Sequence, residues 1–472
     1  MIKREVRLRF APSPTGYLHV GGLRTALFNY LFAKQNNGKI ILRIEDTDQK
    51  RLVKDSIDKI IASLKWIGID FDEGPHTKNQ NKGPYAQSER LDLYRENVVS
   101  LIEKGYAYTC LYPDERILQI SQDESLKKSA AEYDKKFKDN RPEDSISNMK
   151  KKNSVVRLAM PANENILVKD LIRGNLKFDS SLLDDPIIIK SDGYPTYHFA
   201  NVVDDHHMKI SHVIRGEEWL PSLPKHIHLY KCFNWEIPEF AHLPLLLNHD
   251  RTKLSKRQGD VAVEDYIKKG YFRESLVNFI ALLGWHESNN REFYTMNDLI
   301  DAFSLKRVQS SGAIFDIKKL NWINQHYLRQ KSSNEIIQLS KNHIPSDWSV
   351  NEKMVDLIKD KTQTIEELKE DLKIFFRTPE NLKKKLEQNF PSSTISNIQA
   401  SMIKNLEKYS HIDKEIFNQI MKKVAEESDC KGKSLWQPVR LMLTGQARGP
   451  ELLGFMQAIG IQECINRLKD VK

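Results

Sequence analysis

The stretch VRLRFAPSPTGYLHVGG, residues 6–22, decides which fold the chain can adopt. Its first part, up to Ala11, is typical of a short apolar β-strand, and the Pro/Gly-rich segment that follows breaks this strand. Apolar side chains then recur at the spacing of a helix, at Leu23, Ala26, Leu27, Tyr30 and Leu31. The pair Asn37-Gly38 is expected to end that helix.

The alternation of strand and helix continues through the first 90 residues and returns near residue 196. Lys39–Ile44 is rich in Ile and predicts a second strand, and the helical spacing of residues 53–64 ends before Gly68. Farther along we expect a strand at Val213–Arg215, a helix at Pro221–Phe233 and a strand-like run at Leu243–Leu247. This pattern predicts a parallel sheet of the doubly wound type, split into two halves.

The segment between the two halves has a different character. Residues 121–152 carry many charged and few large apolar side chains, as in an exposed helical excursion. Val155–Leu158 and Pro186–Lys190 predict strands, and Asp192-Gly193 predicts a hairpin turn. After residue 260 helical patterns dominate. The predicted domains are residues 1–93 and 196–259 for the split sheet, 94–195 for an α+β insertion, 260–328, and 329–472.

Composition restricts the class of protein. The 472 residues include 73 Lys and Arg against 64 Asp and Glu, a net charge of +9, which fits either a solvated surface or a polyanionic partner. No stretch of the sequence reaches the roughly 18 consecutive apolar residues that a membrane-spanning helix needs. The first residues lack the apolar stretch of a secretory signal. The four cysteines are widely spaced, which favours a reducing cytoplasm over a disulfide framework.

The first candidate site is the turn from Ala11 to Gly22, where a strand passes into a helix. The start of a helix offers free N–H groups and a positive dipole end, which suit phosphates. Gly21 and Gly22 would allow a flat base or a phosphate to approach the backbone, and His19 could donate a hydrogen bond to a phosphate oxygen. The alternative is an ordinary glycine-rich helix start with a surface histidine.

The second candidate site is the polar loop KLSKR, residues 253–257, which follows the last predicted strand of the sheet. Its three cations could neutralise a leaving pyrophosphate, and a mobile loop could close over that group. Taken alone, the segment could equally be a basic surface loop.

Together, PSPTG at 12–16 with HVGG at 19–22 and KLSKR at 253–257 resemble the two signature segments of class I aminoacyl-tRNA synthetases. The neighbouring segments are similar to those of bacterial glutamyl-tRNA synthetases, and this resemblance covers essentially the whole chain. They are RIEDTD at 43–48, GPYAQSER at 83–90, Ser191–His206 and Val213–Trp219.

The resemblance implies an enzyme that activates glutamate with ATP, with Mg²⁺ carried by the ATP, and transfers it to tRNA. It implies catalytic roles for His19 and Lys256. The implied ATP-binding residues are Pro12, Gly16, His19, Gly21, Gly22, Lys253, Ser255, Lys256 and Arg257.

A pocket for glutamate needs cations for two carboxylates and an anion for one ammonium group, and arginine suits a carboxylate because its fork pairs bidentately. The resemblance places Arg9 and Arg215 beside the site. We assign Arg9 to the side-chain carboxylate, Arg215 to the α-carboxylate and Glu45 to the ammonium. The further implied contacts are Ala11, Ser13, Tyr197 and Asn201.

The resemblance also implies a domain architecture that can bind tRNA: an α/β Rossmann-like catalytic domain followed by all-helical stem-contact and anticodon-binding domains. Residues 94–195 would hold the acceptor end, 260–328 would contact the stem and 329–472 would read the anticodon. Trp436, Arg440 and Arg448 are candidates there, although that stretch also fits an amphipathic core helix. The expected partner of a monomeric enzyme is tRNA(Glu), and the alternative is a non-discriminating enzyme that also glutamylates tRNA(Gln).

The sequence departs from the family pattern at two positions, and four other classes of protein fit it less well. Gly22 stands where many class I enzymes have a second histidine, and Cys110 lacks the second cysteine of the zinc site found in some relatives, so no structural zinc is predicted. A glutaminyl-tRNA synthetase would carry β-barrels at its C-terminal end. The paralogue that glutamylates queuosine would lack residues 329–472, and a basic RNA-binding protein or a simple nucleotidyltransferase would not need the whole set of motifs.

Overall fold

The computed structural model describes residues 4–78, 80–112, 134, 136–254, 261–377 and 382–471. The chain forms two compact units. Unit 1 consists of residues 1–265 and 276–316, and unit 2 of residues 266–275 and 317–472. The five domain ranges expected from the sequence are finer than this division and stay a prediction.

Unit 1 combines short strands with helices. Its strands are β1 (Arg7–Phe10), β2 (Lys39–Leu42), β3 (Ala107–Leu111), β4 (Ser154–Leu158), β5 (Asn165–Asp170), β6 (Gly174–Asp179), β7 (Ile187–Ile189), β8 (His212–Gly216), β9 (Glu239–Leu243), β10 (Leu246–Leu247) and β11 (Ala313–Ile314). Its α-helices are α1 (Val20–Gln35), α2 (Ser56–Ile67), α3 (Leu91–Glu103), α6 (Pro142–Asn148), α7 (Tyr197–His207), α8 (Leu223–Phe233) and α11 (Met296–Ala302). The division between the units falls within α9 (Val263–Lys268) and α10 (Arg273–Leu282).

Parallel strands form the centre of unit 1. β1 pairs in parallel with β2, and β8 pairs in parallel with β9. The Ser211 N–H donates to the Arg7 carbonyl at 2.9 Å, which places the start of β8 beside β1. The strand order is therefore β2, β1, β8, β9, followed by β5 and β6. The predicted Rossmann-like parallel sheet is confirmed.

Helix α1 follows β1 and is buried along most of its length. It packs on β1, β2 and β8 and on α11, where Phe28 and Phe303 form an edge-to-face pair with ring centroids 5.0 Å apart. The Asn29 side chain donates to the Ile214 carbonyl at 3.1 Å. This contact links α1 to β8. Because α1 follows the end of β1 in the chain, the start of α1 lies at the carboxyl ends of the parallel strands, where such sheets bind ligands.

The run Leu243–Leu247 was predicted as one strand, and that prediction is wrong. β9 ends at Leu243, Pro244 follows without an N–H to donate, and Leu246–Leu247 form β10. β10 pairs in parallel with β11 in a different sheet, so residues 260–328 are also not all helical. Farther upstream, the helix expected from Pro221 begins as a 3-10 turn at Glu217–Ser222 and becomes α8 at Leu223.

The predicted insertion contains a small antiparallel sheet with the order β3, β4, β7. β4 and β7 fall where strands were expected, and the turn at Gly193 has a φ of +84°. Such a conformation suits glycine, which lacks a Cβ. Residues 121–133 and 135 of the helical excursion expected at residues 121–152 lie outside the described residues, and α6 (Pro142–Asn148) falls within the described remainder.

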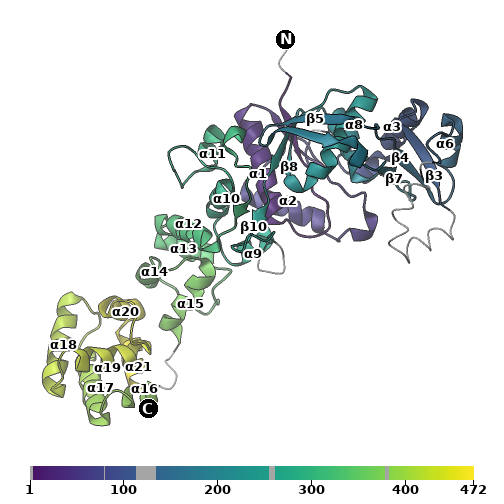
Figure 1. The fold of residues 1–472 in the computed structure, drawn as a ribbon. Helices are drawn as coiled ribbons and strands as arrows, with labels where there is room; N and C mark the ends of the chain where they lie inside the picture. Colours follow the sequence, from purple (N-terminus) through teal and green to yellow (C-terminus); the bar gives the residue numbers. More distant parts are fainter. Residues whose placement is uncertain are drawn as a thin grey trace. The chain divides into compact units, whose positions relative to one another are not determined.

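The hairpin β5–β6 was not predicted and joins the central sheet. Its strands pair antiparallel from Asn165 opposite Asp179 to Asp170 opposite Gly174. Asp170 also stands opposite Phe240 of β9 in parallel register. A segment within residues 94–195 therefore extends the sheet formed by the flanking parts of the chain (Figure 1).

Unit 2, drawn from green to yellow in Figure 1, forms helices throughout its described part. They are α12 (Ile317–Gln330), α13 (Ser333–Ser340), α14 (Glu352–Ile358), α15 (Ile365–Phe376), α16 (Leu382–Glu387), α17 (Ser392–Leu406), α18 (Lys414–Ser428), α19 (Lys433–Thr444), α20 (Leu452–Ile459) and α21 (Ile461–Lys469). The buried Arg467 donates to the carbonyls of Ile374, Phe375 and Leu443. It thereby satisfies carbonyl groups at the ends of α15 and α19 that have no partner within their own helices.

Among the described residues, every helix is too short or too polar to cross a membrane.

The turn between α1 and β2 depends on a close approach at Gly38. A Cβ added there would lie 2.3 Å from the Val6 carbonyl oxygen. We expect Gly38→Ala to shift β1 or the turn and to destabilise unit 1 by about 1–3 kcal/mol. The loss of stability is measured by thermal denaturation, with limited proteolysis as the readout of unfolding. Gly449→Ala, where the nearest atom is 3.6 Å away, is the control; equal stability of the two variants would contradict the prediction.

Candidate active site

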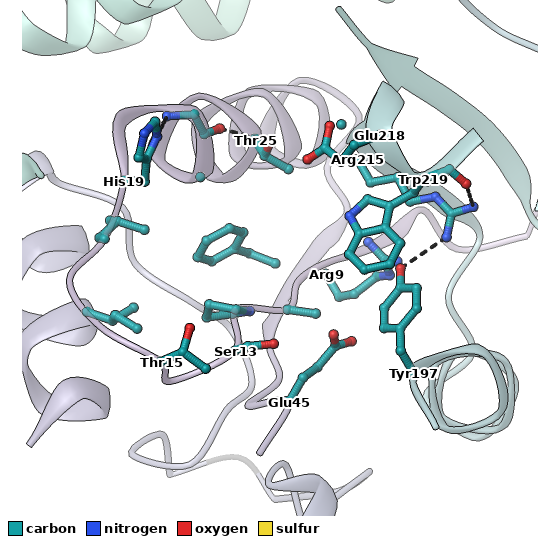
Figure 2. Close-up of a pocket in the computed structure, with 18 of the residues that line it drawn as sticks. Arg9, Ser13, Thr15, His19, Thr25, Glu45, Tyr197, Arg215, Glu218 and Trp219 are labelled. Atoms are coloured by element: carbon teal, nitrogen blue, oxygen red, sulfur yellow. Dashed lines mark hydrogen bonds between the residues drawn. The ribbon is translucent and has the colours of Figure 1, made fainter. Parts of the chain in front are cut away.

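A pocket of about 340 Å³ opens at the carboxyl ends of β1 and β8. Its walls come from the turn after β1, the start of α1, the segment after β2, the start of α7 and the end of β8. Figure 2 shows His19 at one end of this pocket and Arg215, Tyr197 and Trp219 at the other. Parts of the chain that are about 200 residues apart therefore meet in one site.

His19 is the N-cap of α1. Its Nδ1 accepts a hydrogen bond from the Gly21 N–H at 3.0 Å. A neutral imidazole that accepts at Nδ1 carries its proton on Nε2, so the ring can donate from Nε2. A Cβ on Gly21 would lie 3.3 Å from this Nδ1, so a side chain there would crowd the imidazole.

The start of α1 is suited to an anion. The Val20 N–H donates to the Val261 carbonyl at 2.8 Å and the Gly21 N–H to His19. The Gly22 N–H has no acceptor among the described residues, and Gly22 lines the pocket. A free N–H at the positive end of a helix is a common feature of phosphate sites.

A second pocket of about 300 Å³ adjoins the first and shares His19, Gly21 and Gly22 with it. Lys253, one of the predicted ATP-binding residues, lines this second pocket. The predictions for Ser255, Lys256 and Arg257 lie outside the described residues. Pro12 lines the first pocket, whereas Gly16 lines neither.

Arg9 projects from β1 into the pocket and is only 3% exposed. Its Nε donates to Asp205 of α7 at 3.0 Å. Within the described part of the chain, the two terminal amino groups of Arg9 form no hydrogen bond. One edge of the guanidinium is thus fixed by a carboxylate, and the other edge is open to a ligand.

Arg215 stands at the end of β8 on the far side of the same pocket and is held differently. Its Nε donates to His242 at 3.0 Å, and its Nη1 contacts Tyr197 Oη and His226 Nδ1, each at 3.1 Å. Its Nη2 donates to the Trp219 carbonyl at 3.4 Å. Arg9 and Arg215 therefore both face the pocket, as expected from the sequence.

Glu45 is a buried carboxyl group that lines the same pocket as the two arginines. Burial raises the pKa of Glu45, and the nearby Arg43 and Arg9 offset only part of this effect. A cation that bound beside Glu45 would favour its ionised form.

The other residues predicted to bind the amino acid also line the pocket: Ala11, Ser13, Tyr197 and Asn201. In the orientation that satisfies both ends of its amide, Asn201 donates to Asp205 Oδ2 at 3.2 Å and accepts from Arg43 at 3.0 Å. Asn201 thus supports the arginine and carboxylate groups around the pocket.

Sequence reasoning did not single out several pocket residues. Trp219 packs against Tyr197 with ring centroids 4.0 Å apart and ring planes tilted by 33°. Thr15, Tyr17, Thr25 and Glu218 also line the pocket. Trp219 and Glu218 belong to the segment Val213–Trp219, whose motif marked the region without assigning them a role.

The part of the chain that the structure describes contains no group of three His, Cys, Asp or Glu side chains arranged to hold a metal ion. Cys110 is buried on β3, and burial raises the pKa of its thiol to about 12. The prediction that the protein has no structural zinc stays a prediction.

Comparison with known proteins identifies the class to which this fold and pocket belong. Residues 5–322 match the family described as tRNA synthetases class I (E and Q), catalytic domain, and residues 324–472 match an anticodon binding domain. The chain belongs to the class I tRNA synthetases.

Full-length relatives narrow the family. The chain is 42% identical to a glutamate–tRNA ligase of Clostridioides difficile and 40% identical to one of Alkaliphilus metalliredigens, each over 99% of both chains. A crystal structure of a glutamate–tRNA ligase from Elizabethkingia meningosepticum in complex with its amino acid is 35% identical, with a TM-score of 0.84 over 99% of both chains. Within its class, the chain is therefore a member of the glutamate–tRNA ligase family.

The raised pKa of Glu45 predicts that this residue destabilises the ligand-free protein. A folded-state pKa above the unfolded value of about 4.3 means that stability falls as the pH rises through the raised pKa. We therefore expect Glu45→Gln to raise the melting temperature at pH 7, with a difference that shrinks toward pH 4.5.

Scanning calorimetry between pH 4.5 and pH 8 measures this difference. Glu96→Gln on the exposed side of α3 is the control and should change little. A lower melting temperature for Glu45→Gln at pH 7 would show that Arg9 and Arg43 stabilise the carboxylate more than burial penalises it.

Proposed function

We propose that the chain ligates L-glutamate to tRNA(Glu) in two steps. In the first step glutamate and ATP give glutamyl-adenylate and pyrophosphate, and in the second the glutamyl group passes to tRNA with release of AMP. The observation that carries this proposal is one pocket in which two arginines and a buried carboxyl group lie next to the start of α1.

The charges of the pocket match those of glutamate. The open terminal amino groups of Arg9 suit the side-chain carboxylate, and the remaining N–H of Arg215 suits the α-carboxylate. Glu45 is positioned to accept the ammonium group, which would lower the raised pKa of its carboxyl. A dicarboxylic amino acid could thus pair each of its charges with an opposite charge on the protein.

Adenylate formation needs positioning and charge neutralisation rather than a protein nucleophile. The α-carboxylate attacks the α-phosphorus in line, and pyrophosphate leaves. His19 can donate from Nε2 to a phosphate oxygen, and Gly22, whose N–H has no acceptor among the described residues, lines the same pocket. The predicted partners on the leaving side are Lys253, Ser255, Lys256 and Arg257.

Magnesium enters this scheme with ATP. Phosphate oxygens and water would supply most of its ligands. When bound, it would neutralise part of the phosphate charge. The pocket residues would then orient the two reactants and exclude water.

The second step brings tRNA to the same pocket, where we expect the 2′-hydroxyl of its terminal ribose to attack the adenylate. The match of residues 324–472 to an anticodon binding domain supports the expected role of that region. In α19, Trp436 is 43% exposed, whereas Leu435, Val439 and Met442 are buried. Most residues of α19 therefore pack in the hydrophobic core. Trp436 and the exposed Arg448 remain candidates for contact with bases. We expect a monomeric, cytoplasmic enzyme.

The function is tested by exchange of radioactive pyrophosphate into ATP, with tRNA present and each amino acid supplied in turn. L-Glutamate should support exchange, and L-glutamine and L-aspartate should not. Exchange that does not depend on L-glutamate would refute the proposal.

Charging assays then determine which tRNA accepts glutamate. Purified tRNA(Glu) should accept labelled glutamate, and the same assay with tRNA(Gln) decides the alternative. Charging of both tRNAs would identify a non-discriminating enzyme, and charging of tRNA(Glu) alone a discriminating one.

His19→Asn separates the capping role of His19 from its catalytic role. Asparagine is a good N-cap and can accept from the Gly21 N–H, so the melting temperature should stay within about 2 °C of that of the unmodified protein. Loss of the imidazole N–H should lower kcat for exchange about a hundredfold, with a much smaller change in the KM for glutamate. An unchanged kcat would exclude His19 from the chemistry.

A further inference from the structure

Arg215 is surrounded by uncharged acceptors. Its four hydrogen bonds go to two histidine ring nitrogens, a tyrosine oxygen and a backbone carbonyl. No carboxylate oxygen of the described residues lies within 4.0 Å of its nitrogens. An arginine has five N–H groups, so one N–H on Nη2 remains for a ligand.

A buried carboxylate stands behind this arginine, on the other side of His242. The Nδ1 of His242 lies 2.7 Å from Asp170 Oδ2, and its Nε2 accepts from Arg215. Both Asp170 and His242 are almost fully buried. The other oxygen of Asp170 accepts from the N–H groups of Ile172 and Arg173, each at 2.9 Å. The three side chains thus form a row from Asp170 through His242 to Arg215.

The donors in this row determine where the protons of His242 sit. Arginine can only donate, so the Nε2 of His242 must accept and must be unprotonated. The Nδ1 of the neutral ring then carries the proton, which it donates to Asp170. Burial lowers the pKa of His242, in agreement with a neutral ring. Asp170 therefore selects the one tautomer of His242 that can accept from Arg215.

A second histidine pair holds the other side of the guanidinium. His226 Nδ1 lies 3.1 Å from Arg215 Nη1, and its Nε2 lies 3.3 Å from His198 Nδ1. By the same reasoning His226 donates from Nε2 to His198. Burial lowers the pKa of His226 well below its usual value and that of His198 to about 4.

The neutral surroundings of Arg215 differ from those of Arg9, which lies 3.0 Å from the carboxylate of Asp205. Because neutral acceptors orient Arg215 without cancelling its charge, that charge stays available to a carboxylate in the pocket. A carboxylate in place of His242 would compete with the ligand for the same guanidinium.

We propose that Asp170 and His242 are positioning residues of the active site: by fixing one neutral tautomer of His242, Asp170 orients Arg215 to receive a carboxylate of the substrate. This inference rests on the proposed function, because it takes the substrate to be L-glutamate. It assigns a role at the amino-acid pocket to a residue of the hairpin β5–β6, which the sequence placed in the insertion.

Asp170→Asn tests the proposal with nearly the same side-chain shape. The amide oxygen can still accept from Ile172 and Arg173, so the amide nitrogen faces His242 and donates to its Nδ1. The histidine proton is then on Nε2, where it opposes the Nε–H of Arg215. In pyrophosphate exchange with tRNA present, the KM for L-glutamate should rise roughly ten- to a hundredfold. The kcat and the KM for ATP should change less than about threefold.

The double variant Asp170→Asn with His242→Gln is the rescue. A glutamine has no tautomers, and its amide oxygen can accept from Arg215 near the position of the imidazole Nε2. The KM of the double variant for L-glutamate should be well below that of Asp170→Asn alone. His212→Asn, on the same strand as Arg215 but outside this row, is the matched control and should leave all three parameters unchanged.

Three kinetic outcomes would overturn the proposal: an unchanged KM for glutamate in Asp170→Asn, an equal rise in the KM for glutamate and for ATP, or a double variant no better than Asp170→Asn. Nitrogen-15 shifts of His242, assigned with His242→Gln, give a readout that does not depend on activity. They should report a proton on Nδ1 in the unmodified protein and on Nε2 in Asp170→Asn, and the same tautomer in both would refute the inference. Failure of the proposed function looks different, because the unmodified protein would then show no glutamate-dependent exchange.

Discussion

The pocket depends on one buried ion-pair group centred on Asp205 of α7. Asp205 accepts from Arg9 of β1 at 3.0 Å and from Arg43, which follows β2, at 2.7 Å. Burial alone would raise the pKa of Asp205, but the two arginines outweigh burial and lower it. Removal of one member of such a buried group leaves an uncompensated charge, which is costly. Strands β1 and β2 and helix α7 are therefore held at fixed positions around the site, although the chain between them is long.

The two arginines of the pocket illustrate two ways to bury a cation. Arg9 keeps a carboxylate partner and offers its terminal amino groups, whereas Arg215 has only uncharged acceptors among the described residues. The first arrangement favours rigidity, and the second preserves charge for a ligand. Glu45, whose pKa burial raises, adds an acceptor for a cation in the same pocket. A ligand with charges of both signs can thus neutralise what the protein alone leaves unbalanced.

The parts of the fold that were predicted correctly have strong local signals. β1, α1 and β2 follow from hydrophobic spacing and turn residues, and the motifs around His19, Glu45 and Arg215 led to side chains that share one pocket. β9 was missed because Glu239 and His242 make it look polar and because the apolar run continues past Pro244. Asp170 was missed because its role depends on the pairing of β5 with β9, which no local pattern reveals. The polar loop KLSKR, residues 253–257, falls largely outside the described residues.

The hairpin β5–β6 also limits how this protein can be rearranged. Its turn is fastened to the sheet by Asp170 and by Arg173, whose Nε donates to the His242 carbonyl at 3.3 Å and whose guanidinium pairs with Glu217. Residues 94–195 are therefore not a detachable module, even though they interrupt the sheet in sequence. A chimaera that exchanged this whole segment with that of a distant relative would replace the residues that hold His242, and through it Arg215, beside the pocket. Because the hairpin lies between β4 and β7 in the sequence, an exchange of the small sheet β3–β4–β7 that kept the hairpin would need additional junctions on both sides of β5–β6.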